Sequence, residues 1–165
     1  METQKIEYNP IGIIHTPFKK AGGVPIQPRR GHDIMGTVEV FPEYREALDD
    51  LDGFSHIILI YHLHLSQGFK LKVIPFLDDQ LRGLFATRAP RRPNPIGLSV
   101  IRLDKIEKTT LHIRDLDIID GTPLLDIKPY VPDFESDDKY RIGWLTGKVQ
   151  RYDRADADNR FEDNE

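Results

Sequence analysis

The stretch that most constrains this chain is rich in proline and arginine and occupies residues 85–99. Its sequence, FATRAPRRPNPIGLS, contains three prolines. Because proline fixes φ, lacks an amide donor and pushes the preceding residue toward extended conformations, the stretch is predicted to be neither helix nor central strand. Residues 82–92 contain four arginines and no acid. The sequence therefore predicts a stiff loop that binds an anion, either a carboxylate of the protein itself or an external carboxylate or phosphate.

Length and charge set the frame for this loop. A chain of 165 residues is long enough for one domain that buries about 70% of the surface exposed when unfolded. It has no cysteine, which excludes disulfides and favours a reducing, cytoplasmic location, and its longest apolar run, residues 57–61, is too short to cross a membrane. The net charge is −4, of which residues 150–165 carry −3. We expect a near-neutral domain over residues 1–149, compatible with RNA, and a flexible acidic tail over residues 150–165.

The distribution of β-branched residues predicts a mainly β fold. Turn signals are expected at Glu107 and Lys108 and at the Asp-Gly-Thr-Pro of residues 120–123, each between paired strands. A short helix is expected over residues 42–50, where proline starts the first turn, and a closing element over residues 144–149. Strands are expected over residues 8–16, 35–41, 54–65, 71–75, 84–87, 98–106, 110–119 and 124–130. This pattern predicts a single-domain antiparallel β-barrel with one short helix and long loops.

Two histidines offer a candidate metal site. His62 and His64 lie two positions apart in an expected strand, so both side chains are predicted to face the same side of the sheet. A first-row metal needs a third ligand, and the sequence contains His15, His32 and His112 without a spacing that selects one. The alternative is that these histidines form hydrogen bonds in or beside the core, and on that interpretation no metal is expected.

Two common enzyme classes find no support in the sequence. It lacks the G-x-G-x-x-G and G-x-x-x-x-G-K-[ST] patterns that bind dinucleotides and phosphates. No serine lies on the strand-to-helix elbow of a hydrolase, and Ser99 is expected within a strand. The residues alone therefore predict a β domain with an arginine loop and a turn at Asp120, and they name no reaction.

Five segments in a fixed order resemble the TrmO family, also called TsaA-like or VirR-like. They are IGIIHTPF (11–18), GFSH (53–56), FATR (85–88), RPNPIGLS (92–99) and LDIIDGTPLLDIKPY (116–130), and the resemblance extends over residues 8–134. It implies a β-barrel methyltransferase that uses S-adenosyl-L-methionine and works as a homodimer. The implied substrate is tRNA that carries N6-threonylcarbamoyladenosine beside the anticodon, and the implied reaction adds a methyl group to its N6.

The resemblance also implies which residues bind the cofactor and the RNA. Arg88 is expected to hold the cofactor's carboxylate, and Asp117 or Asp120 its ammonium or ribose hydroxyls. Two positions depart from the family's pattern, Ile26 and Leu65, so only backbone roles are carried over there. The full cofactor set is Pro25, Ile26, Gln27, His64, Leu65, Arg88, Leu98, Asp117, Ile118, Ile119 and Asp120, and the RNA contacts are Arg91, Arg92 and Asn94.

The sequence leaves the catalytic base and the final choice of function open. Asp120 and His64 are candidates for the base only because of their location. Three alternative functions remain: methyl transfer to another acceptor, binding of S-adenosyl-L-methionine or a nucleotide without turnover, and a metal-dependent barrel enzyme that uses His62 and His64.

Overall fold

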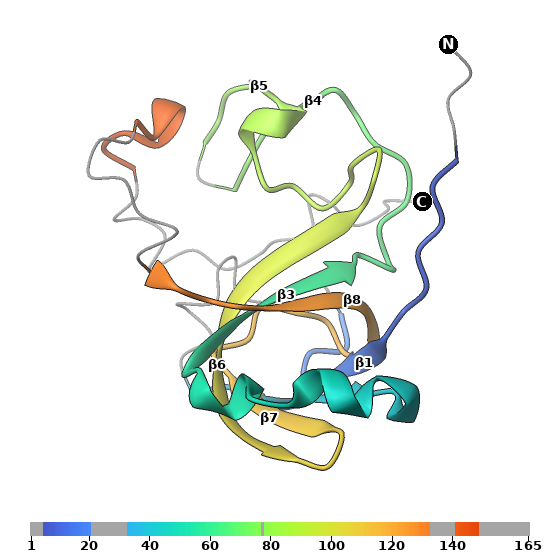
Figure 1. Cartoon of the computed structure of the whole chain (residues 1–165). Helices are drawn as coiled ribbons and strands as arrows, with labels where there is room; N and C mark the ends of the chain where they lie inside the picture. The colour runs from blue at the N-terminus through green and yellow to red at the C-terminus, as the bar shows by residue number, and fades with distance from the viewer. Residues whose placement is uncertain (1–4, 21–32, 77, 133–140, 149–165) are drawn as a thin grey trace.

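The computed structural model describes residues 5–20, 33–76, 78–132 and 141–148. Six antiparallel strands form a closed barrel in the order β1-β2-β7-β6-β3-β8 (Figure 1). These strands are β1 (Gly12–His15), β2 (Met35–Val40), β3 (His56–His62), β6 (Ile96–Glu107), β7 (Thr110–Arg114) and β8 (Thr122–Pro129). The mainly β, antiparallel barrel that the sequence predicts is confirmed. No helix in these ranges is long and apolar enough to cross a membrane.

Four short 3-10 helices and a second sheet complete the described chain. The 3-10 helices are η2 (Pro42–Leu48), η3 (Leu51–Gly53), η4 (Leu84–Ala86) and η5 (Gly143–Leu145). β4 (Lys72–Val73) pairs with β5 (Arg82–Gly83), and this pair lies above the barrel in Figure 1, whereas η2 and η3 lie below it. We call residues 70–76 and 78–92 the small lobe. It has its own apolar cluster of Val73, Leu84 and Ala89.

Alternating side chains fill the barrel. In β3, Ile57, Leu59 and Tyr61 are buried, while the residues between them are partly exposed. β6 likewise turns residues 97, 99, 101 and 103 inward. Because successive strand residues point to opposite faces, an alternating sequence closes into a barrel with one apolar interior. Other strands contribute Ile14, Val38, Val40, Leu111, Ile113 and Leu124 to the same core.

Several expected elements have different types or bounds. Residues 84–87 are not a strand, because residues 84–86 form η4, and the strand expected over residues 110–119 ends at Arg114. The helix expected over residues 42–50 is the 3-10 helix η2, with proline in its first turn. The loop expected over residues 85–99 ends where β6 begins, since residues 96–99 pair with β3. Pro95 is the last proline of this stretch, and residues 96–99 have amide donors for strand pairing.

One of the two expected hairpins is correct. β6 and β7 pair up to Glu107 and Thr110, and Lys108 has a φ of 58° in the connecting turn. The turn at residues 120–123 is not a hairpin, because β8 pairs with β1 and β3 rather than with β7. Gly121 has a φ of 75°, so the tight turn itself is real. The closing element expected over residues 144–149 is η5, and the acidic tail lies outside the described residues.

Candidate functional site

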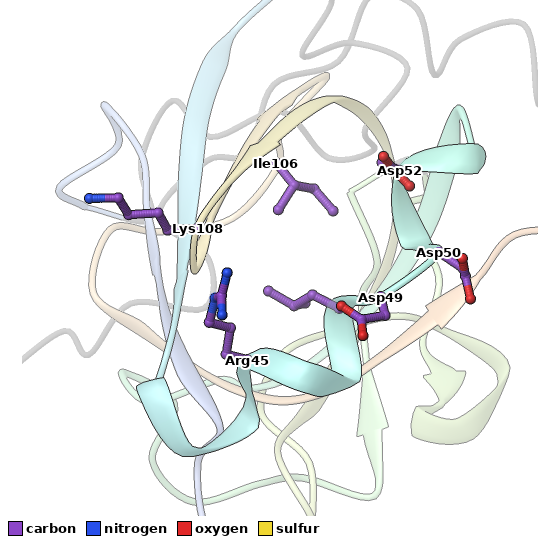
Figure 2. A pocket seen from close by; sticks show the side chains of 7 residues that line it. Arg45, Asp49, Asp50, Asp52, Ile106 and Lys108 are labelled. Atoms are coloured by element: carbon purple, nitrogen blue, oxygen red, sulfur yellow. The ribbon is translucent and has the colours of Figure 1, made fainter.

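The lower end of the barrel has a hollow that contains none of the expected site residues. It is open, has a volume of about 220 Å³ and lies between η2, η3 and the β6–β7 hairpin. Figure 2 shows charged side chains arranged around Ile106; the lining residues are Arg45, Leu48, Asp49, Asp50, Asp52, Ile106 and Lys108. The expected residues that the structure describes instead follow the end of β3, precede or begin β6, or precede β8. In the antiparallel pairing of β3 with β6, these positions lie at the opposite end.

The loop of residues 115–121 closes this opposite end. Its backbone is held by the chain that follows β1: the Asp120 amide donates to the Phe18 carbonyl at 2.7 Å, and the Gly121 amide donates to the Ile14 carbonyl at 2.9 Å. The Thr16 hydroxyl donates to the Ile118 carbonyl at 2.8 Å. These bonds fix the positions of both aspartates in the loop relative to the barrel, so the expected residues 117–120 lie on a firmly anchored segment.

Asp117 ends a chain of hydrogen bonds that begins inside the barrel. The Tyr61 hydroxyl lies 2.9 Å from Ser99 Oγ, and Ser99 Oγ donates to Asp117 Oδ1 at 2.7 Å. Tyr61 and Ser99 are 6% and 1% exposed. Burial raises the pKa of Asp117 to about 7, although the Ser99 bond and the nearby Arg88 guanidinium oppose the change. Near neutral pH, the carboxyl therefore exists in both protonation states.

Gly97 leaves space for the ring of Tyr61, the first residue in this series of hydrogen bonds. Gly97 is the β6 partner of Tyr61, and a Cβ at Gly97 would lie 2.1 Å from a carbon of the tyrosine ring. Burial also raises the pKa of Tyr61, so its hydroxyl remains protonated at neutral pH. When Asp117 is ionised, the Tyr61 hydroxyl donates to Ser99 and the Ser99 hydroxyl donates to Asp117. The sequence indicated Ser99 only as a strand residue and did not indicate Tyr61.

Asp120 is held as a carboxylate. The Thr16 amide donates to its Oδ1 at 3.0 Å, Lys19 Nζ donates to its Oδ2 at 2.5 Å, and His15 Nδ1 lies 3.7 Å from Oδ1. The Lys19 bond, followed by the Thr16 bond, lowers the pKa of Asp120 below its usual value. A carboxylate that is already satisfied by two donors is a weak proton acceptor.

His64 differs from Asp120 in both geometry and protonation. It lies in the turn after β3, so the prediction that His62 and His64 share a strand face is wrong. The Thr122 hydroxyl donates its one proton to the Ile119 carbonyl at 2.7 Å, and Thr122 Oγ1 lies 3.3 Å from His64 Nδ1. His64 Nδ1 is therefore the donor to Thr122, which leaves the lone pair on Nε2. Burial, followed by the neighbouring His62, lowers the pKa of His64, so the ring is neutral at pH 7.

The arginines of the loop divide into two groups. Arg82 Nε donates to Asp78 at 2.7 Å, and Arg92 Nη1 donates to the Thr87 and Ala89 carbonyls at 2.9 and 3.2 Å. For these two arginines the partner is internal. Arg88 is exposed and close enough to Asp117 to act on its pKa. The predicted RNA contacts Arg91, Arg92 and Asn94 are brought together in this same loop; Arg91 is half-buried, and Asn94 is exposed.

The remaining expected cofactor residues have different environments. Leu65 and Leu98 are 55% and 52% exposed and present apolar side chains at the surface. The Ile118 side chain is part of the barrel core, so only its backbone is accessible to a ligand. Ile119 contributes the carbonyl that binds Thr122. Pro25, Ile26 and Gln27 lie outside the described residues. No group of three potential metal ligands occurs within the part of the chain that the structure describes.

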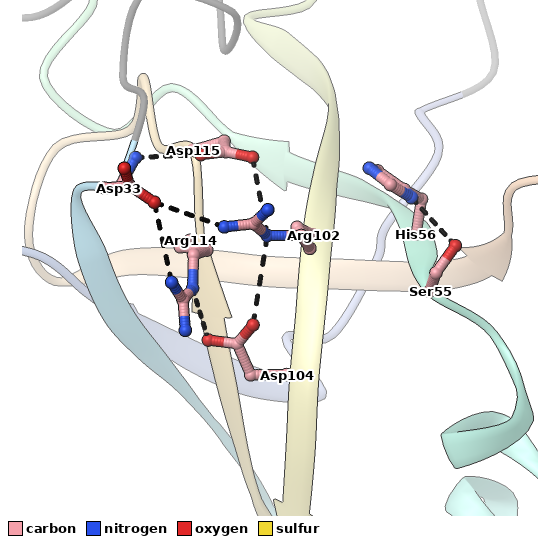
Figure 3. A network of polar contacts seen from close by, with 7 residues as sticks. All are labelled: Asp33, Ser55, His56, Arg102, Asp104, Arg114 and Asp115. Carbon is pink, nitrogen blue, oxygen red and sulfur yellow. Dashed lines mark hydrogen bonds and ion pairs between the residues drawn. The ribbon is translucent and has the colours of Figure 1, made fainter.

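A network of five charged side chains anchors the start of the loop (Figure 3). The Asp33 amide donates to Asp115 Oδ1 at 3.0 Å, and Arg102 Nη2 donates to Asp33 Oδ1 at 3.2 Å. Arg114 Nε donates to Asp104 Oδ2 at 2.6 Å. Asp33 directly follows residues 21–32, and Asp115 starts the loop that carries Asp117, so the network connects two segments expected at the cofactor site. Sequence analysis did not indicate this network, because its members come from three separate segments.

Comparison with known proteins identifies close relatives. Residues 13–136 match the family model described as the tRNA-methyltransferase O N-terminal domain. A probable S-adenosyl-L-methionine-binding protein of Pyrococcus abyssi is 56% identical over 154 residues, which cover 93% of this chain and 84% of that protein. The rat tRNA (adenine(37)-N6)-methyltransferase is 35% identical over 143 residues, which cover 82% of this chain and 33% of the rat protein.

A solved structure has the same fold. The crystal structure of TrmO from Pseudomonas aeruginosa superposes with a TM-score of 0.72 at 36% sequence identity. The match covers 86% of this chain and 63% of that chain, so the chain spans somewhat less than two thirds of the crystallised protein.

Proposed function

The chain belongs to the tRNA-methyltransferase O family, and from this premise we propose that it methylates N6 of N6-threonylcarbamoyladenosine beside the anticodon of tRNA. S-adenosyl-L-methionine is the cofactor, as in the archaeal proteins named for binding it. Methylation of a tRNA adenine at N6 is the activity in the name of the rat relative. The observation that carries the proposal is the arrangement of exposed Arg88, half-buried Asp117 and neutral His64 at one end of the barrel.

The residues at this end fit the chemical groups of the cofactor. Exposed Arg88 is suited to a carboxylate, and Asp117, held by Ser99, is suited to an ammonium group. The exposed side chains of Leu65 and Leu98 are suited to the flat apolar face of an adenine. When bound, S-adenosyl-L-methionine supplies an electrophilic methyl group on a sulfonium.

His64 is the proposed proton acceptor of the reaction. The acceptor N6 is conjugated to a purine and a carbamoyl group, so its lone pair is a poor nucleophile unless its proton is removed. In the tautomer that Thr122 imposes, His64 Nε2 has a free lone pair, and the lowered pKa keeps the ring neutral. Asp120 is bound by Thr16 and Lys19, and its pKa is lowered. We therefore assign the transfer of the N6 proton to His64 Nε2, and to Asp120 the positioning of the loop.

The proline-rich loop is the proposed RNA contact. Arg91 and Asn94 offer donors to phosphate or to the threonyl carboxylate. A cytoplasmic location is proposed together with this substrate. Arg92 is bound to two loop carbonyls and lies 5.7 Å from the Phe85 ring, so it shapes the loop that presents the other two residues.

We also propose a homodimer, supported by exposed apolar side chains around the small lobe and the start of β6. A cluster of this kind is costly in water and marks surfaces that bind a partner. Its members are Leu65, Phe69, Leu71, Ile74, Leu81, Phe85, Ile96 and Leu98, and each is at least 43% exposed. Sedimentation equilibrium tests this point, because a monomer at micromolar concentration contradicts it.

Methyl transfer to defined tRNA tests the central proposal. The protein is incubated with isotopically labelled S-adenosyl-L-methionine and tRNA that either contains or lacks N6-threonylcarbamoyladenosine, and the digested nucleosides are analysed by mass spectrometry. Label confined to the modified nucleoside supports the proposal. Cofactor binding without transfer to either tRNA contradicts it and favours a different acceptor or a binding module without turnover. The His64→Gln variant, which keeps a polar side chain, is expected to bind the cofactor but to transfer methyl groups at least about 100-fold more slowly than the wild type.

A further inference from the structure

The C-terminal segment of residues 141–148 packs against the small lobe. Trp144, in η5, donates its indole N–H to the Ala86 carbonyl at 2.8 Å. Cations lie near the indole ring: the Arg82 guanidinium is 5.4 Å and Lys148 Nζ is 5.7 Å from its centroid. Figure 1 shows this segment in red, after β8 in the chain and next to the lobe of β4 and β5. The end of the described chain therefore contacts a lobe that lies about 60 residues earlier in the sequence.

A buried carboxylate fixes the segment. Asp78 accepts from Lys148 Nζ on one oxygen and from Arg82 Nε on the other, both at 2.7 Å, and its side chain is 1% exposed. The Lys148 bond is the largest cause that holds the pKa of Asp78 well below its usual range. Because charge-assisted bonds to a buried carboxylate are strong, Asp78 joins the segment to the lobe at a second point beside Trp144.

The contact at Ala86 leads directly to Arg88. Ala86 ends η4, and the next residue, Thr87, is bonded to the Leu84 carbonyl through both its amide and its hydroxyl, at 3.0 and 2.8 Å. Leu84 and Ala89, on either side of this turn, are buried in the core of the lobe. Arg88 thus extends from a short rigid turn, and Trp144, from a distant segment, binds the Ala86 carbonyl of that turn.

We propose that residues 141–148 form a brace whose Trp144 positions Arg88 for the cofactor. This rests on the proposed function, in which Arg88 holds the cofactor's carboxylate. The brace lies beyond residues 13–136, the part that matches the family model. Its effect is entropic: a turn that is already fixed loses less freedom when the long Arg88 side chain binds its ligand.

A double-mutant cycle on cofactor affinity tests the brace. The dissociation constant of S-adenosyl-L-methionine is measured by calorimetry for the wild type, Trp144→Ala, Arg88→Ala and the double variant. Loss of one hydrogen bond that positions a ligand residue is expected to raise the constant about three- to tenfold in Trp144→Ala. If Trp144 acts through Arg88, then Trp144→Ala has no further effect in the Arg88→Ala background. Trp144→Phe, which keeps an aromatic ring for the two cations but lacks the N–H, separates the hydrogen bond from the cation–π contacts.

Controls distinguish positioning from loss of stability. Leu48→Ala removes a buried side chain at the opposite end of the barrel, so it is expected to lower stability without changing cofactor affinity. Lys148→Met breaks the bond to Asp78 without truncating Trp144, and this variant provides the test of the brace if Trp144→Ala does not fold. Hydrogen exchange of the 84–90 amides gives a readout without cofactor, and it is expected to increase in Trp144→Ala and Lys148→Met but not in Leu48→Ala.

Each outcome is decisive. Unchanged affinity in folded Trp144→Ala and Lys148→Met overturns the brace, and so do effects of Trp144→Ala and Arg88→Ala that simply add. If Arg88→Ala itself leaves the affinity unchanged, the cofactor role of Arg88 is wrong, and the brace's effect on binding fails with it. The exchange data then show whether residues 141–148 still order the turn, which separates failure of the ligand assignment from failure of the brace.

Discussion

Replacing Asp117 with asparagine should make the protein more stable above neutral pH. In the folded state, burial raises the pKa of Asp117 from 3.8 to about 7. Because each pKa unit corresponds to about 1.4 kcal/mol, ionising this carboxyl in the fold costs up to about 4 kcal/mol. Asparagine keeps an oxygen that accepts from Ser99 and has no proton to lose in this range, so the variant avoids that cost.

The sign of the effect follows from the proton count. Below pH 3.8, Asp117 is protonated in both folded and unfolded chains, and it adds no pH dependence. Between pH 3.8 and about 7, only the unfolded chain has lost the proton, so the free energy of unfolding falls as the pH rises. Above pH 7 the carboxyl is ionised in both states and the loss is complete. Asp78, Glu107 and Asp120, whose pKa values are lowered, act in the opposite direction at lower pH, and they are present in both proteins.

Urea unfolding at a series of pH values measures this difference. The free energy of unfolding of Asp117→Asn minus that of the wild type should increase by about 4 kcal/mol between pH 4 and pH 8, and should be constant above pH 8. Asp52→Asn, which removes an exposed charge at the other end of the barrel, is the matched control. A difference that does not change with pH between 4 and 8 would refute the reasoning, because it would mean that Asp117 has an ordinary pKa in the fold.

The same carboxyl predicts a functional signature. If the cofactor's ammonium lies against Asp117, it favours the ionised form, so binding at pH 7 should release about half a proton. Calorimetry in buffers of different ionisation enthalpy measures that number. Asp117→Asn should bind the cofactor more weakly and release no proton. Equal proton release by the variant and the wild type would mean that Asp117 does not contact the cofactor's ammonium group.

Three other perturbations give further tests. The methylation rate should fall as the pH drops through the lowered pKa of His64, and in the slow His64→Gln variant this acid limb should be absent from the pH–rate profile. Gly97→Ala places a Cβ against the facing tyrosine ring and should cost about 1–3 kcal/mol in urea unfolding, whereas Gly53→Ala, with no atom within 4 Å of the new Cβ, should cost far less. Arg102→Ala removes the cation between Asp33 and Asp115 and should lower the free energy of unfolding by about 1–2 kcal/mol, a value between those of exposed and buried ion pairs. Equal stability of the variant and the wild type would argue against the network.

The barrel was accessible to sequence analysis because its signal is local. The alternation in β3 and β6 and the turn at Lys108 depend on neighbouring residues, and each was recognisable in the sequence. The pairing of β8 was not, because closure of the barrel brings β8 between β1 and β3, far from the preceding strand β7. A turn signature such as that at Gly121 reports only the local backbone conformation, and it does not report which strand lies alongside.

The arginine loop shows the same limit in its side chains. The sequence indicated that the cluster needs an anionic partner, but it did not distinguish internal from external partners and did not anticipate neutral carbonyls. Arg82 is bound by Asp78, only four positions away, yet the same carboxylate also binds Lys148, seventy positions away. Arg92 is bound by carbonyls of its own loop. The sequence analysis named neither partner of Asp78, and proximity in sequence could have suggested only Arg82, not the lysine that connects the chain's end to the lobe.

The proposed roles of the two candidate bases rest on contacts between distant segments. Both Asp120 and His64 lie within residues 8–134, where the chain resembles the family, and their residue types alone favour neither as a proton acceptor. Lys19 and the Thr16 amide satisfy the aspartate, whereas the Thr122 hydroxyl directs the histidine's proton to Nδ1 and leaves Nε2 free. These partners come from the chain after β1 and from the start of β8, two strands that pair only when the barrel closes. Closure thus satisfies the aspartate as an anion and leaves the histidine neutral with an open Nε2, which is why the proposed assignment required the fold.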